Sequence, residues 1–246
     1  MGRTRPGRAT LRTFFELLGS DRCAAISHVS ADQADWIAEI VAECCPAAVQ
    51  CADPFHVVKW ATEALNEVRR AAWNEARRSG QTRGKGYRNR VATGDARRFK
   101  TARYALWKNP DNLTERQRDK LAWIAKTDPR LHRAYLLKEG LRYVFTVKGD
   151  AGKVALDRWL SWARRCRIPA FVQLARRISA HRDRIHAALE HDLSNARIES
   201  ANTKIRLLTR LAFGFRSAEA LITLAMLSLA GHRPVLPGRP DPRISQ

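Results

Sequence analysis

The stretch from Cys23 to Asp53 reads CAAISHVSADQADWIAEIVAECCPAAVQCAD, and its pattern decides the fold. It contains an apolar run at Cys23–Ser30, a helical pattern at about Asp32–Cys45, and a second apolar run at Ala47–Ala52. Strand, helix and strand within roughly 30 residues are typical of a βαβ unit, whose strands are parallel and whose crossover is almost always right-handed. An amphipathic helix is predicted just before this unit, at about Ala9–Leu18. The sequence therefore predicts an α/β fold.

An aspartate follows each predicted strand, Asp32 after the first and Asp53 after the second. Parallel strands end on the same edge of a sheet, and ligands of open α/β sheets bind at that edge. Converging carboxylates there are suited to Mg²⁺, which prefers hard oxygen ligands. Each aspartate also has a structural interpretation, because Asp32 can cap the helix after it and Asp53 can cap a helix that begins at Pro54. Asp35 is a weaker metal candidate.

Charge indicates the class of partner. The 246 residues include 45 Lys or Arg against 24 Asp or Glu, which gives a net charge of +21. Such an excess favours a polyanion, most often nucleic acid, with an anionic membrane surface as the second choice. A hydrophobic content of 45% predicts a packed core rather than a disordered basic tail.

Neither export nor a membrane span is indicated. Charged residues interrupt the N-terminal apolar stretch, and the longest apolar run, Ala218–Ala230, is too short for a span of ~20 residues. The five cysteines form no CxxC pair, so buried reduced thiols are expected in place of a zinc site. We expect a cytoplasmic, nucleoid-associated protein with no membrane partner.

Residues 54–192 are predicted to be mostly helical, with periodic segments at about Pro54–Arg78, Glu115–Lys126, Pro129–Val147, Ala151–Arg165 and Pro169–His191. Within them, residues 77–103 carry ten Lys or Arg and a single acid, Asp95. Aromatic residues interleave with these cations, a pattern that suits a nucleic-acid groove, although a flexible solvated linker fits as well. The candidate DNA-binding residues of this segment are Arg83, Lys85, Arg88, Arg90, Arg97, Arg98 and Lys100.

The stretch from Leu193 to Arg216 holds a single carboxylate, Glu199, among five basic residues. Opposite charges usually intersperse on an ordinary solvated helix face, so a lone acid suggests a divalent-cation ligand beside cations that bind phosphates. A solvated amphipathic helix is the alternative. The DNA-binding candidates here are Arg197, Lys204, Arg206 and Arg210. The next helix, ending at Ala230, is apolar nearly all round and is expected to be buried.

Four stretches carry a resemblance to a known family. The run DPFHVVK at residues 53–59 looks like the D-x-F-H-V-x-K signature of bacterial insertion-sequence transposases. The run NARIESANTKIR at residues 195–206 is similar to the motif around their last catalytic acid, and AFGFR at 212–216 with GHRP at 231–234 continues the match. Together these motifs, over about residues 9–239, resemble the ISL-three type of DDE transposase.

The resemblance implies a ribonuclease H-like fold with a large helical insertion, and a Mg²⁺- or Mn²⁺-dependent attack on DNA phosphodiesters. Asp32 resembles the second catalytic acid and Glu199 the third, so both are implied metal ligands. Asp53, His56 and Asn202 are implied to support them. The implied parts are a partial core at 1–53, the insertion at 54–192, C-terminal core helices at 193–230 and a Pro/Gly-rich tail at 231–246.

Two departures from the family pattern matter. Ser200-Ala201 replaces the usual Gly-Leu after the glutamate, and the first catalytic aspartate has no counterpart, since Asp21 lies in the wrong place. We therefore expect an incomplete core, an inactive fragment, and an exposed strand edge that favours self-association or association with an intact transposase. The alternative function is a non-catalytic DNA-binding regulator of transposition.

Overall fold

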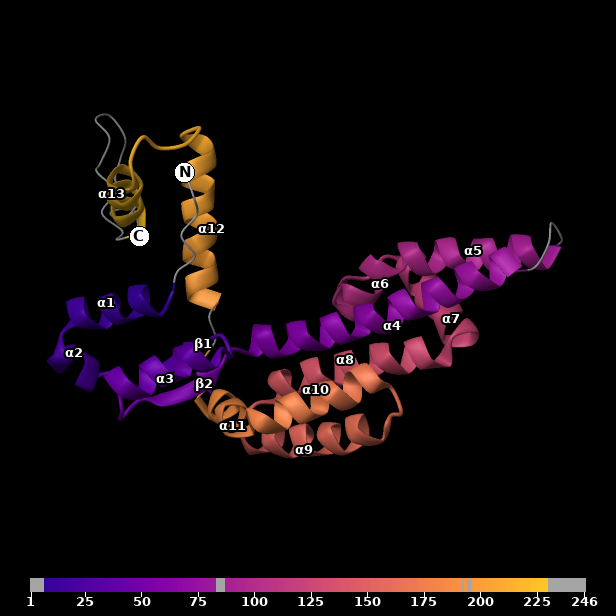
Figure 1. The fold of residues 1–246 in the computed structure, drawn as a ribbon, viewed down its shortest axis with the longest axis horizontal. Helices are drawn as coiled ribbons and strands as arrows, with labels where there is room; N and C mark the ends of the chain where they lie inside the picture. Colours follow the sequence, from indigo (N-terminus) through magenta and orange to yellow (C-terminus); the bar gives the residue numbers. More distant parts are fainter. Residues whose placement is uncertain (1–6, 83–86, 192, 194–195, 230–246) are drawn as a thin grey trace, which may run out of the picture. The chain divides into compact units, whose positions relative to one another are not determined.

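The computed structural model describes residues 7–82, 87–191, 193 and 196–229, with side chains described outside 80–93 and 194–199 (Figure 1). The chain divides into two units, Met1–Ser194 and Asn195–Gln246, which are described separately. Among the described residues the protein is mostly helical and contains one two-stranded sheet. None of the helices described is long and apolar enough to cross a bilayer.

The predicted βαβ unit is present. Strands β1 (His28–Ala31) and β2 (Val49–Ala52) pair in parallel, with His28 opposite Val49 and Ala31 opposite Ala52. Helix α3 (Asp35–Cys44) connects them. The α/β class is thus confirmed, whereas the ribonuclease H-like core stays a prediction.

The first strand begins later than predicted. Helix α1 (Arg8–Leu18) ends at Gly19, whose φ of 84° turns the chain into a short helix, α2 (Ser20–Ala24). Cys23 therefore lies in α2 and not in a strand. Within α2 it is buried beside Phe15 in a small core. The apolar residues that begin at Cys23 are buried on a helix. A short apolar run in a sequence is equally compatible with a buried helix and a buried strand.

The sheet end of the molecule leaves apolar surface uncovered, as predicted. Phe14 and Leu17 of α1 and Val49 of β2 are exposed, and β1 and β2 are each other's only partners within the described residues. Unpaired strand edges template association with other chains. Self-association itself stays a prediction.

The helical part follows the predicted segments closely. Its elements are α4 (Pro54–Thr82), α5 (Tyr87–Thr101), α6 (Arg103–Trp107), η1 (Pro110–Asn112), α7 (Glu115–Thr127), α8 (Pro129–Val147), α9 (Gly149–Arg165), α10 (Pro169–Ala180) and α11 (Arg182–His191). Asp128 caps α8 by accepting a hydrogen bond from the Leu131 N–H at 2.9 Å. The helix predicted at 169–191 is wrong in one respect, because the backbone at His181 leaves helical geometry and separates α10 from α11.

Helices α4, α8, α9 and α10 form the main core. Helix α4 packs against α8 and α10, while α9 packs against the same two helices (Figure 1). Leu137 and Leu141 of α8, Leu156 of α9 and Phe171 of α10 are fully buried there. Helix α11 packs on β2, which joins the sheet to the helical part.

The second unit contains α12 (Ala196–Leu211) and α13 (Ala218–Leu229). Within this unit Ala225 is the one buried residue of α13, and Ile222 and Met226 are exposed, so the expected burial of this apolar helix stays a prediction. Within this unit α12 is the single described helix that packs against α13, and one helix cannot cover an apolar surface on every side.

Candidate functional site

Three polar side chains converge where the two parallel strands end. His56 Nδ1 lies 2.7 Å from Asp53 Oδ2 and 3.0 Å from Asp32 Oδ1. The Asp53 side chain is 1% exposed, that of His56 26% and that of Asp32 52%. The cluster therefore runs from a buried carboxylate, through a half-buried imidazole, to a carboxylate in solvent.

The strand register places the two aspartates together. Ala31 pairs with Ala52 as the last pair of the ladder, so Asp32 and Asp53 leave the sheet at the same level. The Asp53 N–H donates to the Ala31 carbonyl at 3.4 Å, which extends the pairing by one bond. His56 follows on the first turn of α4, three residues after Asp53, a spacing that brings two side chains together on a helix.

Asp53 has two roles in the structure. Its Oδ1 accepts from the Phe55 N–H at 3.3 Å and its backbone carbonyl accepts from the Val57 N–H at 3.2 Å, so it caps α4. Its other carboxylate oxygen contacts His56. The structural interpretation of Asp53 is thus confirmed, and it does not exclude the contact with the cluster.

Asp32 is not a helix cap. Helix α3 begins at Asp35 with Ala34 as its capping position, where no side chain accepts a hydrogen bond. The Asp32 carboxylate contacts His56 and is otherwise open to solvent. Of its two sequence interpretations, the capping one is wrong.

The ligand atoms of Asp32, Asp53 and His56 all lie within 4.8 Å of one another, close enough to hold one cation. One ring nitrogen faces both carboxylates, so a proton on Nδ1 or a cation beside it satisfies both negative groups. Ser30 Oγ and Gln33 Oε1, which flank Asp32 in the sequence, are buried without a hydrogen-bond partner in the structure. Two carboxylates with unsatisfied oxygens nearby suit a hard divalent ion, and the imidazole also accommodates Mn²⁺ or Zn²⁺.

The surroundings fit a large substrate better than a small one. The hollow beside Asp32 and Gln33 has a volume of about 10 Å³, room for about one water molecule. Small-molecule pockets typically have volumes of ~300–1,000 Å³. Burial raises the pKa of the Cys51 thiol in β2, which keeps it protonated and a poor metal ligand.

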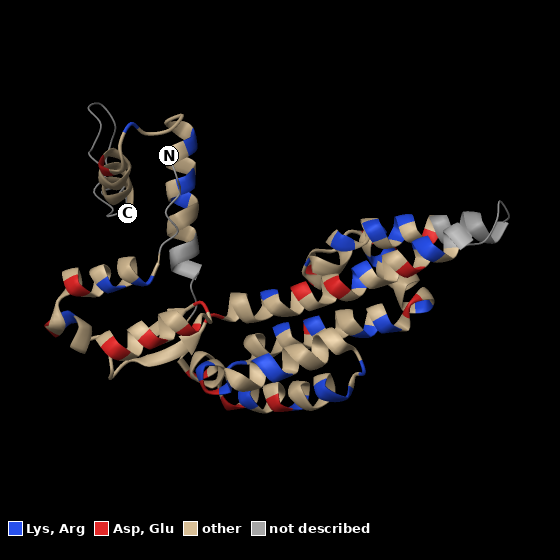
Figure 2. Ribbon diagram, in the orientation of Figure 1, with Lys and Arg blue, Asp and Glu red and all other residues tan. Residues whose placement is uncertain are grey.

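The remaining predicted site residues lie elsewhere. Helix α12 includes Glu199 and Arg197, but their side chains lie outside the described residues. Asn202, Lys204, Arg206 and Arg210 are exposed on the same helix. Arg83 and Lys85 lie outside the described residues altogether, as do the side chains of Arg88 and Arg90. Arg97, Arg98 and Lys100 are exposed on α5, and the described parts of the 77–103 segment are helical rather than a flexible linker (Figure 2).

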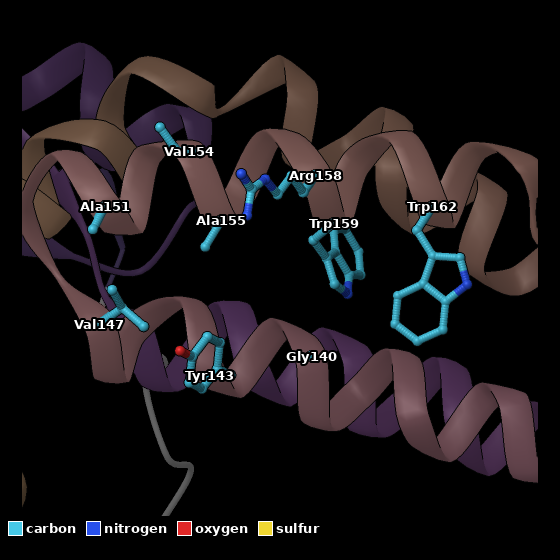
Figure 3. Close-up of a pocket in the computed structure, with 9 residues that line it drawn as sticks. All are labelled: Gly140, Tyr143, Val147, Ala151, Val154, Ala155, Arg158, Trp159 and Trp162. Atoms are coloured by element: carbon cyan, nitrogen blue, oxygen red, sulfur yellow. The ribbon is translucent and has the colours of Figure 1, made fainter.

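Three surface hollows of the helical part were not predicted. One is a groove of about 510 Å³ between α8 and α9, lined by Tyr143, Trp159, Trp162 and smaller apolar residues, with Arg158 as the single charged residue in its lining (Figure 3). Two others adjoin the basic segment and bring Tyr104, Arg116 and Lys120 beside its cations. Arg103 and Tyr104 lie at the end of the basic sequence run, but Arg116 and Lys120 become neighbours through the packing of α7.

Comparison with known proteins gives a consistent picture. A family model described as "Transposase", of the ISL-three DDE type, matches residues 2–225. The transposase for insertion sequence element IS1557 of Mycobacterium tuberculosis is 66% identical over 97% of this chain and 56% of its own length. The transposase for element IS1001 of Bordetella parapertussis is 28% identical over 87% of this chain and 50% of its own length. The chain thus spans about half the length of these relatives, and no solved structure matches it.

Proposed function

This chain belongs to the ISL-three type of transposase family, and from that premise we propose that it supplies part of a DDE-type DNA-cleaving and strand-transfer centre. In this proposal Asp32 and Glu199 bind Mg²⁺ or Mn²⁺, while Asp53, His56 and Asn202 support them. The observation that carries it is the convergence of Asp32, Asp53 and His56 at the ends of two parallel strands.

A divalent cation bound there stabilises negative charge on the oxygens of the attacked phosphodiester. The chain's own residues arrange the acids. Asp53 is fixed by burial and by its bonds at the start of α4, and its second oxygen orients His56. His56 in turn orients Asp32, which is the exposed member of the cluster. A carboxylate whose neighbours are fixed loses less conformational entropy when it binds a cation.

DNA is the proposed substrate, with the element ends and the target as its sources. Support comes from the net charge of +21 and from the exposed cations of α5 and α12. We propose that the βαβ unit and the α12–α13 unit belong to a ribonuclease H-like core, with residues 54–192 as its helical insertion. Action on DNA implies a nucleoid-associated location.

The chain by itself is proposed to bind DNA without cutting it. Its motifs contain counterparts of two of the three acids that a DDE enzyme uses, Asp32 and Glu199. It then acts by binding, as a regulator or as a partner of an intact transposase. The unpaired outer edge of β1 in the described sheet supports association with other copies.

The proposed cation site is tested by Mn²⁺ titration of the purified chain by calorimetry. Asp32→Ala and Glu199→Ala are expected to weaken Mn²⁺ binding at least ~10-fold, and His56→Ala by ~10- to 100-fold, as for residues that orient metal ligands. Asp35→Ala is the matched control, an exposed aspartate three residues away that lies outside the cluster. Equal loss in the Asp35 variant, or no loss in the other three, would overturn the site.

The second arm of the test uses element-end DNA with Mg²⁺. The chain is expected to bind this DNA and leave it intact. Cleavage that disappears in Glu199→Ala would contradict the non-cutting part of the proposal, while leaving the assignment of the acids in place.

A further inference from the structure

Helices α5, α6 and α7 form a surface with two adjacent hollows, which we name the arm surface. The first has a volume of about 560 Å³ and is lined by Arg97, Lys100, Thr101, Arg103 and Tyr104. The second has a volume of about 380 Å³ and is lined by Arg98, Arg116, Asp119, Lys120 and Trp123. Together they hold six cations and one carboxylate.

A hydrogen bond between two lining residues connects the two hollows. Lys120 Nζ of α7 donates to Thr101 Oγ1 at 3.1 Å and lies 3.4 Å from the Thr101 carbonyl at the end of α5. The Thr101 hydroxyl also contacts the Arg97 carbonyl at 3.1 Å. These bonds tie α5 to α7 and bring a cation of the second hollow against Thr101, a lining residue of the first.

The cations of the arm surface are not held in ion pairs by described residues. No ion pair joins any of the six to a described carboxylate, whereas Arg142, Lys153 and Arg182 each pair with an acid. Two of the six stack on indole rings, Arg98 on Trp123 at 5.2 Å and Arg103 on Trp107 at 3.9 Å. Stacking restricts a guanidinium without using its N–H donors, which leaves it ready to bind phosphate.

One aromatic ring on this surface is free to stack. Tyr104 is 70% exposed in the first hollow, whereas Phe99 is buried and Trp107 is covered by Arg103. A phenol ring offers a face to any nucleobase that is itself unpaired, while the bases inside a duplex already stack on both faces. Phe99 and Trp107 are therefore not the aromatic residues that a base can reach.

We propose that the arm surface binds an unpaired DNA strand, with its phosphates on the six cations and one base stacked on Tyr104. The proposal rests on the proposed function for the identity of its polyanion, but it requires neither Asp32 nor Glu199. Its ligand is a strand of three or more nucleotides, such as a frayed or overhanging end.

The test measures fluorescence anisotropy of a labelled 20-mer single strand and of the matching duplex. Tyr104→Ala is expected to weaken single-strand binding ~5- to 150-fold, the range for loss of one base–aromatic stack, and Tyr104→Phe to restore it. Replacing Arg97, Lys100 and Arg103 together by Gln is expected to flatten the log–log salt dependence of single-strand binding by about 2.

Tyr143→Ala is the matched control, since Tyr143 is 62% exposed in the α8–α9 groove (Figure 3) and the lining of that groove has one cation. It is expected to leave single-strand affinity unchanged. Equal weakening in both tyrosine variants, or none in Tyr104→Ala, overturns the stacking site. Single-strand binding that survives Asp32→Ala and Glu199→Ala separates this proposal from the cation site, whose failure appears in the Mn²⁺ titration alone.

Discussion

Two regions of the molecule each contain a buried charged side chain whose contacts lead to a different kind of group. Asp53 is 1% exposed at the sheet end, and Lys138 is 2% exposed in the middle of α8. Asp53 contacts a half-buried histidine that leads to an exposed aspartate. Lys138 donates to the Leu106 carbonyl at 2.9 Å and pairs with Glu139, which in turn accepts from Arg142.

The two clusters differ in the group through which the buried charge is connected to solvent. The Asp53 cluster ends in Asp32, a carboxylate whose side chain is 52% exposed and offers ligand atoms to a cation, whereas the Lys138 cluster runs through Glu139 to Arg142, a cation whose side chain is 35% exposed. Burial lowers the pKa of Lys138, and it raises the pKa of the adjacent Tyr135 to about 12. The network of the buried charge thus ends at the surface in an acid at the sheet end and in a cation in the helical part, and the acidic end is the one suited to binding a metal cation.

The largest effect expected from this comparison is on Lys138. Lys138→Ala leaves the Leu106 carbonyl and Glu139 without their partner, so unfolding free energy should fall by ~3–5 kcal/mol. Lys138→Met keeps the volume and removes the buried charge, and is expected to be much less harmful. Urea denaturation followed by circular dichroism measures both. Equal losses in the two variants would show that the core requires the ammonium group of Lys138 and its bonds, rather than the volume of its stem.

A smaller effect is expected at Asp53. Asp53→Ala removes the cap of α4 and should cost ~0.5–2 kcal/mol of unfolding free energy. Asp53→Asn retains an oxygen that accepts from the Phe55 N–H, so its stability should stay close to that of the original chain while Mn²⁺ binding weakens. Thermal melting with and without Mn²⁺ separates the two roles. An Asp53→Asn variant with the melting temperature of Asp53→Ala and an unchanged affinity for Mn²⁺ would contradict both roles assigned to Asp53.

The smallest effect is a difference in pH dependence. Because the folded-state pKa of Lys138 lies below its ordinary value of 10.5, the unfolded chain holds more protons between the two values. The free energy of unfolding of the unsubstituted chain, relative to that of Lys138→Met, should therefore rise as pH rises between these two pKa values. Tyr135 has the opposite effect, because burial raises its pKa from 10 to about 12. Its contribution to the free energy of unfolding is therefore lost as pH rises between these two values.

Urea titrations at a series of pH values below 10 isolate the lysine contribution. A difference between Lys138→Met and the unsubstituted chain that stays constant across this range would show that burial does not lower the pKa of Lys138 into it. Asp53→Asn serves as the control, since it leaves the Lys138 environment intact.

Much of the sheet end could be predicted because its determinants are local. Two apolar runs separated by one helix dictate parallel pairing, and pairing dictates that Asp32 and Asp53 leave the sheet together. The contact of both with His56 depends on register to a single residue, which pattern alone does not give. The start of β1 was misjudged because Cys23 is equally compatible with a buried strand and a buried helix.

The helical part was predicted in its segments and not in its packing. Proline and aspartate mark the start of α8, but nothing local shows that Lys138 faces inward, since that depends on α6, whose Leu106 carbonyl accepts from it. The break at His181 was missed because the apolar periodicity continues across it. Arg116 and Lys120 joined the arm surface only through the packing of α7 against α6 and α8.

The four-residue length of each strand has a consequence for how the sequence can vary. Inserting or deleting one residue in α3 or its loops leaves the pairing of Ala31 with Ala52 possible, because the crossover only has to span the sheet. One residue added within β1 or β2 turns the following aspartate to the opposite face, since side chains alternate along a strand. Length changes should therefore accumulate between the strands and be absent within them, a genetic signature of the cluster that requires no assay.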